Sequence, residues 1–318
     1  MRKKVLSMVM SATLLAAMFV GCGSDKNAGE GGKAEGSSSS SKVILITMDS
    51  TDQHWVSVDK GAKAKAEELG VEYAWMAPDK KDDAQQIERI NNAIADGANA
   101  ILIAANGPDS IIAALDEAKA EGIKIVYVDS PANTEAEATF ATNNEAAGET
   151  AGNEMLKALE AAGVTSGKIG IVNSNAATDS TMKREMGFRK ALEGKGFELL
   201  ETQYSEGDAA QSQDIADNYI TEGCVGVYGT NEGCTVGVGN AIKGAGGSVI
   251  GVGFDKSDAI LSLIEEGSLV CTMAQNPDVM GEKGVEAAVK AIKGEEITEK
   301  NVDTGVSVIN KDTVGNFK

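Results

Sequence analysis

Polar and aromatic side chains follow several short apolar runs of this sequence. Asp52, His54 and Trp55 come shortly after the first run, and they include the only histidine and one of the two tryptophans. Carboxylates and carboxamides follow later runs, at Asn106, Asp109, Asp129, Asn173, Asp179, Asn231, Asp255 and Gln275. Such groups form hydrogen bonds with vicinal hydroxyls, and an aromatic face can cover the C–H face of a sugar ring. These residue types suit a neutral polyol.

The apolar runs alternate with amphipathic stretches from Lys42 onward. The runs lie at 43–47, 71–76, 100–105, 123–129, 168–173, 197–204, 225–230, 248–254 and 269–275. Strands that alternate with helices predict parallel sheets covered by helices on both faces. About 275 such residues exceed a single comfortable core, so we expect an α/β protein of two Rossmann-like lobes.

The order of these elements predicts where the polar residues meet. In open parallel sheets, binding groups lie on the loops that leave the carboxyl ends of the strands. His54 and Trp55 then fall in a loop and first helical turn, where they could form the wall of a pocket. A competing interpretation makes Trp55 the first core residue of its helix and His54 an exposed flank.

The N-terminus has the pattern of an export signal. Three basic residues precede an uncharged stretch at 5–20 that is shorter than the roughly 20 residues of a membrane-spanning helix. Cys22 at the cleavage point resembles the lipobox of bacterial lipoproteins, which implies removal of residues 1–21 and lipidation of Cys22; an uncleaved anchor is the alternative. The Gly/Ser-rich residues 22–42 predict a flexible tether. We therefore expect lipid anchoring at the outer face of the cytoplasmic membrane.

The composition argues against nucleic acid as a partner. The formal net charge is −19, and the chain without residues 1–21 has 26 positive and 48 negative charges, a net −22. Such a surface repels phosphate backbones.

The cysteines do not predict disulfides. Cys224 and Cys234 flank one predicted strand, which places their Cα atoms too far apart for a bridge. With Cys271 they are expected to be small buried hydrophobic residues. The sequence has no Cys/His cluster suited to zinc, and we expect neither a metal nor a cofactor.

Several stretches carry a resemblance to a known family. They are "VSVDKGA" (56–62), "FATNNEAAGETAG" (140–152), "STMKREMGF" (180–188), "VGFDKSD" (252–258) and "MAQNPDVMGEKGVEAA" (273–288). From about residue 43 to 312 the chain resembles the ribose/galactose class of ABC-transporter substrate-binding proteins, which have the periplasmic-binding-protein type I fold. The resemblance implies lobes of 43–142 plus 276–304 and of 143–275 plus 305–318, with three crossings near Asn143, Gln275 and Thr304.

The resemblance also implies site residues and partners. The implied ligand-binding residues are Asp52, His54, Trp55, Asp129, Arg184, Asn231, Asp255 and Gln275. The implied ligand is a neutral monosaccharide, a pentose or hexose, and the implied partners of this monomer are a permease and an ATPase.

The sequence departs from the class at three positions. Ribose-binding members carry Arg where this chain has Ser130. A second ligand Arg falls near Met182, with Arg184 two residues further on, and an aromatic residue falls near Gly207. These departures leave the identity of the sugar open, and three aspartates with one Arg disfavour acidic sugars.

Other functions fit the sequence less well. Asp129 and Asp255 could act as a glycosidase-like acid/base pair, but sugar binders use paired carboxylates as well, and we expect no enzyme. The Gly-rich stretch 236–247 lies in and after a predicted helix, so it fails the dinucleotide-binding pattern. A transcription regulator of this fold would need a DNA-binding helix pair where residues 1–42 lie. A sensor or signalling-molecule receptor of the same fold stays open.

Overall fold

The computed structural model describes residues 41–317. The predicted signal peptide, Cys22 and nearly all of the predicted tether lie outside the described residues. The first strand begins at Lys42, so the last residue assigned to the tether belongs to a sheet. Within residues 41–317, no helix is long and apolar enough to cross a membrane.

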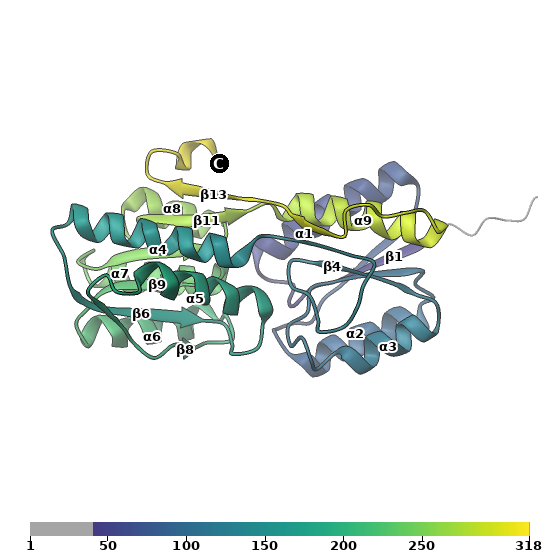
Figure 1. Cartoon of the computed structure of the whole chain (residues 1–318), viewed down its shortest axis with the longest axis horizontal. Helices are drawn as coiled ribbons and strands as arrows, with labels where there is room; N and C mark the ends of the chain where they lie inside the picture. Colours follow the sequence, from purple (N-terminus) through teal and green to yellow (C-terminus); the bar gives the residue numbers. More distant parts are fainter. Residues whose placement is uncertain (1–40, 318) are drawn as a thin grey trace, which may run out of the picture. The chain divides into compact units, whose positions relative to one another are not determined.

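One sheet has six strands in the order β12-β5-β4-β3-β1-β2, and its neighbouring strands are parallel. The strands are β1 (Lys42–Ile46), β2 (Glu72–Met76), β3 (Ala100–Ile103), β4 (Lys124–Val128), β5 (Ala138–Ala141) and β12 (Asn301–Asp303). Its helices are α1 (Gln53–Leu69), α2 (Asp83–Ala95), α3 (Ile112–Ala120) and α9 (Pro277–Lys293). These elements form lobe 1 (Figure 1).

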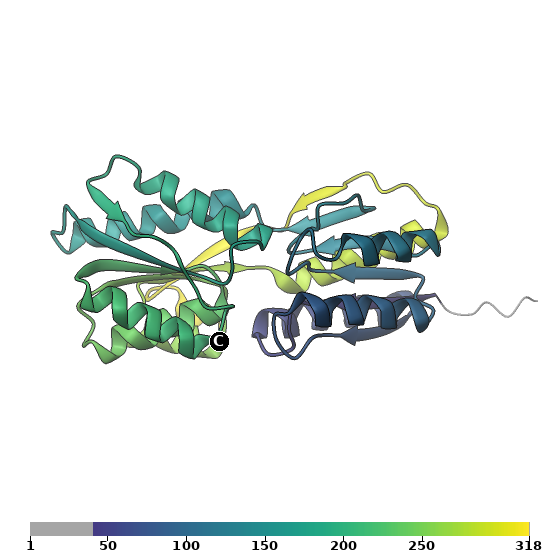
Figure 2. The ribbon, with the colours of Figure 1, turned by 90° about the horizontal axis from the view of Figure 1, so that it is seen from below.

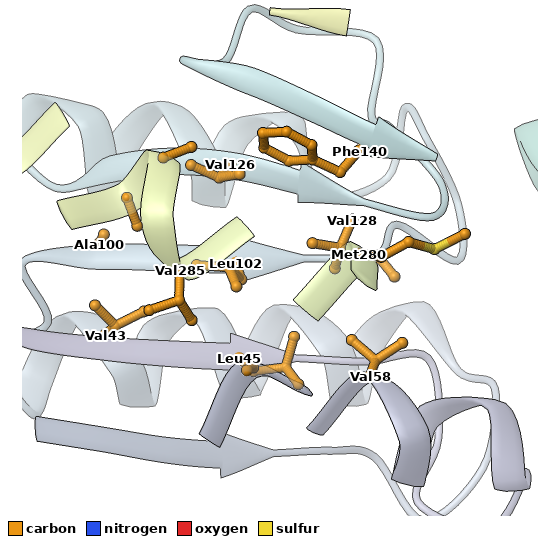
Figure 3. Packing of buried hydrophobic residues seen from close by; sticks show 14 of the residues in the cluster. Val43, Leu45, Val58, Ala100, Leu102, Val126, Val128, Phe140, Met280 and Val285 are labelled. Carbon is orange, nitrogen blue, oxygen red and sulfur yellow. The ribbon is translucent and has the colours of Figure 1, made fainter. Parts of the chain in front are cut away.

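The alternation of side chains along each strand places helices on both faces of this sheet. Val43 and Leu45 of β1 pack in a core with residues of α1 and α9, while Ile44 and Ile46 pack with residues of α2 and α3. Figure 3 shows the first of these cores, with side chains from the strands, from α1 and from α9. Each such buried aliphatic side chain contributes about 1.5–3 kcal/mol.

The second sheet has seven strands, in the order β13-β11-β10-β9-β6-β7, with β8 paired to β6. The strands are β6 (Gly167–Asn173), β7 (Phe197–Leu199), β8 (Gln203–Tyr204), β9 (Cys224–Gly229), β10 (Ile250–Phe254), β11 (Cys271–Gln275) and β13 (Val306–Asn310). Its helices are α4 (Asn144–Ala161), α5 (Asp179–Leu192), α6 (Ala209–Thr221), α7 (Glu232–Gly244), α8 (Asp258–Glu266) and the 3-10 turn η1 (Val314–Asn316). These elements form lobe 2.

Two helical layers also cover the second sheet. One core joins its strands to α4 and α5, and another joins them to α6, α7 and α8. Cys224, Cys234 and Cys271 are buried and free, so the prediction that they are buried is confirmed. The predicted architecture of two α/β lobes is confirmed as well.

The chain passes between the two sheets at three places. These are residues 142–143 between β5 and α4, Asn276 between β11 and α9, and residues 304–305 between β12 and β13. The crossings are hydrogen-bonded to one another, because Thr142 Oγ1 donates to Gln275 Oε1 over 2.8 Å and Asn276 Nδ2 donates to the Thr304 carbonyl over 2.8 Å. Figure 2 shows these connections from below.

Some elements differ from the sequence-based expectation. The expected strand at 197–204 is split into β7 and β8, and β13 runs antiparallel to β11. The helix α4 was not predicted, because glycines weaken its helical pattern. Gly148 of α4 and Gly187 of α5 have a packing role: a Cβ at Gly148 would overlap the Arg184 carbonyl, and one at Gly187 would overlap the Glu145 carbonyl. The close approach of α4 and α5 thus requires glycine in both helices.

Candidate functional site

One small cavity collects side chains from the carboxyl ends of the strands of both lobes. It encloses about 20 Å³, close to the space that one water needs. Its lining includes all eight residues expected to bind a ligand: Asp52, His54, Trp55, Asp129, Arg184, Asn231, Asp255 and Gln275. The remaining lining residues are Met48, Lys81, Ser174, Thr178, Ser180 and Thr181.

A buried cation lies on the lobe 1 side of the cavity. Lys81 Nζ lies 2.7 Å from Asp49 Oδ2 and 2.8 Å from Asp52 Oδ2. Burial disfavours the charge of Lys81, but the two aspartates outweigh it and raise the pKa of Lys81 above its usual value. Two of its three ammonium hydrogens face carboxylates, which leaves one donor for a bound molecule.

Sequence reasoning missed Lys81 as a site residue. It lies between β2 and α2, in the stretch "DKKDD" (79–83), which has the composition of an exposed loop. The available signal was its position after a strand, because the loop that follows β2 belongs to the same sheet edge as the loops that were identified.

The centre of the site is a cluster of opposite charges from both lobes. His54 Nε2 lies 3.0 Å from Asp129 Oδ2, and His54 Nδ1 lies 3.6 Å from Asp255 Oδ1. Arg184 approaches the same two aspartates, at 3.8 Å from Asp129 and 3.9 Å from Asp255. The Arg184 guanidinium also lies over the Phe254 ring, 3.8 Å from its centroid, a cation–π contact.

These charges shift the titration of the cluster. Burial raises the pKa of Asp129, but His54 and then Arg184 outweigh it and lower this pKa to about 2. Burial lowers the pKa of His54, but Asp129 and Asp255 outweigh it and raise this pKa above its ordinary value. The cluster therefore favours an ionised Asp129 facing a protonated His54.

The two central aspartates have unusual backbone conformations. Asp129 directly follows β4 with φ 65°, and Asp255 directly follows β10 with φ 72°. The left-handed region is uncommon for residues other than glycine, and Asp and Asn tolerate it best. In each lobe the aspartate N–H donates to the next strand, from Asp129 to the Phe140 carbonyl and from Asp255 to the Met273 carbonyl, both over 2.9 Å.

The histidine and the tryptophan that follow β1 are both buried. His54 is 6% exposed, so the interpretation of His54 as an exposed flank is wrong. Trp55 belongs to the lobe 1 core and also lines the cavity. Its indole Nε1 donates to Asp49 Oδ2 over 3.1 Å, which fixes the ring.

The remaining lobe 2 residues are held by short hydrogen bonds. Gln275 Nε2 donates to Asp255 Oδ1 over 2.6 Å, which connects the site to the crossing at Thr142. Asn231 Oδ1 accepts the Cys234 N–H at the start of α7. Arg184 is held by Asn144 Oδ1 and by the Thr230 carbonyl.

The departures at Ser130 and Gly207 have structural counterparts. Ser130 Oγ lies 3.0 Å from Asp129 Oδ1 and 2.6 Å from Ser180 Oγ of lobe 2. Gly207 has φ 73°, and a Cβ there would lie 3.1 Å from Lys81 Nζ. Lys81 thus takes the space that a side chain at position 207 would need.

Direct hydrogen bonds also join the lobes beside the cavity. Glu232, the first residue of α7, accepts the N–H groups of Gln53 and His54 at the start of α1, both over 3.1 Å. Thr178 Oγ1 donates to the Asn106 carbonyl over 2.7 Å. Burial raises the pKa of Glu232 to about 7, with a further contribution from Asp52. Sequence reasoning could not find this contact, because its partners are 178 and 179 residues apart.

The chemistry of this arrangement is binding through many directed hydrogen bonds. Acceptors from Asp129 and Asp255 and donors from Lys81, Arg184 and Gln275 surround one cavity, and such a set matches a molecule with several hydroxyl groups. Among residues 41–317, no group of three or more His, Cys, Asp or Glu side chains is arranged to hold a metal ion.

Comparison with known proteins gives consistent matches. The model of the family described as periplasmic binding protein domain matches residues 43–296. The ribose import binding protein of Haemophilus influenzae is 27% identical over 269 residues, which cover 83% of this chain and 90% of that protein. The corresponding protein of Escherichia coli is 28% identical, with coverage of 81% and 87%.

Solved structures agree with these matches. A carbohydrate transporter solute-binding protein from Agrobacterium radiobacter, in complex with D-arabinose, has a TM-score of 0.84 and 28% identity, over 88% of this chain and 97% of that chain. A solute-binding protein from Agrobacterium vitis with bound D-fucose has a TM-score of 0.81 and 29% identity, over 86% and 96%. The resemblance indicated by the sequence motifs is confirmed.

Proposed function

Because the chain belongs to the periplasmic binding protein family, we propose that it binds a neutral monosaccharide between its lobes and delivers it to an ABC importer outside the cytoplasm. One observation carries the proposal: the eight residues expected to bind a ligand line one cavity, although they come from the ends of five strands of both lobes and from α5. The relatives named for ribose and the structures with arabinose and fucose support a monosaccharide.

We assign roles to the residues as follows. Asp52, Asp129 and Asp255 accept hydrogen bonds from sugar hydroxyls, and Arg184, Asn231 and Gln275 donate to them. Either Trp55 or His54 stacks on the sugar ring. The lobes are residues 43–142 plus 276–304 and residues 143–275 plus 305–318, and the protein acts as a monomer.

Binding requires a change of conformation. A cavity of about 20 Å³ has no room for a monosaccharide, so the sugar enters when the lobes separate. A ligand drives closure only if it binds the closed state more tightly, which needs contacts from both lobes. Asp129 provides such a contact from lobe 1 and Asp255 from lobe 2. The closed, loaded protein then docks on the permease, whose partner ATPase drives import.

We further propose lipid anchoring. Acylated Cys22 holds the protein at the outer face of the cytoplasmic membrane, with the residues between Cys22 and β1 as the tether. The Cys22→Ser variant is expected to leave the membrane fraction and to lack a lipid by mass spectrometry. A variant that keeps a lipidated terminus would contradict this anchoring.

A receptor role is the second candidate function. The genes next to this one would distinguish an importer from a sensor.

A thermal-shift screen tests the sugar assignment. D-Ribose, D-allose, D-arabinose, D-fucose and D-tagatose are compared with nucleosides and charged amines. A sugar present at one hundred times its Kd stabilises the protein by about 2.7 kcal/mol, which is visible as a rise in Tm. Rises with nucleosides or amines and none with neutral sugars would refute the assignment.

Matched variants test the aspartate roles. Asp129→Asn and Asp255→Asn preserve a side chain that tolerates positive φ, and each is expected to weaken binding about 10- to 100-fold through a lost charged hydrogen bond. Asp109→Asn is the control, because Asp109 lies beyond β3, bonds to the exposed Asn133 and does not line the cavity. Parent-like binding by Asp129→Asn or Asp255→Asn would make that aspartate structural.

A further inference from the structure

The imidazole of His54 lies between the two aspartates that the proposed sugar would use. Its Nε2 is 3.0 Å from Asp129 of lobe 1, and its Nδ1 is 3.6 Å from Asp255 of lobe 2. The contact with Asp129 is an ion pair without the alignment of a hydrogen bond, so among the described residues buried Nε2 has no hydrogen-bond partner. Histidine thus spans the lobes at the centre of the site.

His54 also lies between the cavity and a neighbouring groove. Together with Asp255 and Gln275 it lines both the cavity of about 20 Å³ and a neighbouring groove of about 560 Å³. The groove runs along α1 past Ser57 and Gly61. A molecule as large as a monosaccharide can occupy the position between Asp129 and Asp255 only after the imidazole has moved, and the groove is the adjoining open space.

We propose that protonated His54 is a plug of the sugar-free site, and that a bound sugar displaces its imidazole and releases its proton to solvent. The inference rests on the proposed function. Sugar hydroxyls then donate to the carboxyl oxygens of Asp129 and Asp255, and the imidazole leaves as the neutral base. One proton is released for each sugar bound, and no other bond is made or broken.

The charges around His54 support this exchange. Asp129 after β4 and Asp255 after β10 stabilise the imidazolium, while Arg184 of α5 opposes it. Glu232 of α7 contacts the His54 backbone N–H. Lys81, which also lines the cavity, is paired with Asp49 and Asp52. The two central aspartates outweigh both burial and Arg184, so the pKa of His54 is raised in the plugged state.

The sign of the pH effect follows from this raised pKa. The plug is fully present below the ordinary pKa of histidine and is lost as pH rises through the raised pKa. Sugar binding is therefore weakest in mildly acid solution and strengthens with rising pH. Between the His54 pKa values of the sugar-bound and sugar-free protein, Kd is expected to change about tenfold per pH unit.

The test uses the chain's single histidine. Proton NMR of tag-free protein gives one imidazole signal, which is titrated without sugar and with a saturating amount of the sugar that raises Tm most in the screen. Without sugar the pKa of His54 is expected above 6.5. With sugar it is expected to fall by at least about one unit, and calorimetry in buffers of different ionisation enthalpy is expected to show proton release.

Two variants distinguish the titration of His54 from that of the neighbouring Glu232. His54→Gln is expected to bind the same sugar with a Kd that is constant from pH 6 to pH 8. Glu232→Gln is expected to keep the pH dependence, because the proton comes from His54. Loss of the pH dependence in Glu232→Gln would assign it to Glu232 and overturn the proposal.

The outcomes also separate this inference from the proposed function. Sugar binding with an unchanged His54 pKa and no proton release would refute the plug and leave the sugar-binding function standing. No binding of any neutral sugar by the parent or by His54→Gln at any pH would overturn both. The NMR titration uses the parent protein, so its result does not depend on the folding of a variant.

Discussion

The buried ion cluster at Lys81 gives a direct test of the site's energetics. Lys81 is 7% exposed and contacts Asp49 and Asp52, which are 2% and 16% exposed. Replacing it with Met keeps the length of the side chain and leaves two buried carboxylates without their cation. Breaking a buried pair from one side costs about 3–5 kcal/mol.

The structure places the expected loss at the lower end of that range. Asp49 Oδ1 still accepts the N–H groups of Thr51 and Asp52, and Asp49 Oδ2 still accepts from the Trp55 indole. We expect Lys81→Met to lose about 3 kcal/mol at pH 7, or about 5–10 °C in Tm. The loss shrinks as pH falls towards 5, because protonation of Asp52, whose pKa is already raised by burial, removes the unpaired charge.

Urea unfolding followed by tryptophan fluorescence measures this effect, since Trp55 adjoins the cluster. Lys243→Met is the matched control: its ion pair with Glu266 is exposed, 57% and 47%, and such pairs contribute about 0–1 kcal/mol. In the double variant Asp49→Asn/Lys81→Met, the loss is expected to be smaller than the sum of the single losses. A loss below about 1 kcal/mol for Lys81→Met at pH 7 would refute the argument that the cluster is buried and paired.

Two further predictions concern packing and pH. Gly148→Ala forces a methyl group onto the Arg184 carbonyl and is expected to lower the free energy of unfolding by about 1–3 kcal/mol. As the control, the added methyl group of Gly244→Ala meets no atom within 4 Å, and this variant is expected to be neutral or stabilising by up to about 1 kcal/mol. Equal Tm values for the two variants would contradict the α4–α5 contact. Glu232 has a pKa raised to about 7 from 4.5, so its contribution favours folding below pH 4.5 and is lost as pH rises to 7. The Tm of Glu232→Gln relative to the parent is therefore expected to increase from pH 5 to pH 8, and a constant difference would show that Glu232 is not buried as described.

Sequence patterns predict the elements of this fold well where side chains alternate regularly. β1 packs Val43 and Leu45 on one face and Ile44 and Ile46 on the other. The unbroken apolar run at 43–47 predicts such a strand, with both faces buried. The antiparallel β13 is harder to predict, because "VSVIN" has the composition of a strand but carries no information on its direction or partner. The strand pattern of this segment alone therefore does not indicate that it pairs with β11.

The site was predictable to the extent that topology determines it. Asp129 and Asp255 were found because each ends a run in a parallel sheet. The contacts between lobes were not predictable, since Glu232 and Gln53 are 179 residues apart and meet only where the two lobes pack together. The contact between Lys81 and position 207 was unpredictable for the same reason. Lys81 occupies the space that a side chain at position 207 would need, and the two positions belong to different lobes.

The left-handed backbones of Asp129 and Asp255 have a consequence for the speed of recognition. Each carboxylate is aimed by the backbone of its own lobe, through the N–H bonds to Phe140 and Met273. Neither N–H bond involves the opposite lobe. Separation of the lobes therefore keeps the backbone conformation of Asp129 and of Asp255, and each lobe keeps its own half of the site. For the proposed function, a sugar that diffuses to an open molecule finds a rigid half-site without waiting for a loop to order, and the association rate is then set by encounter and by displacement of His54.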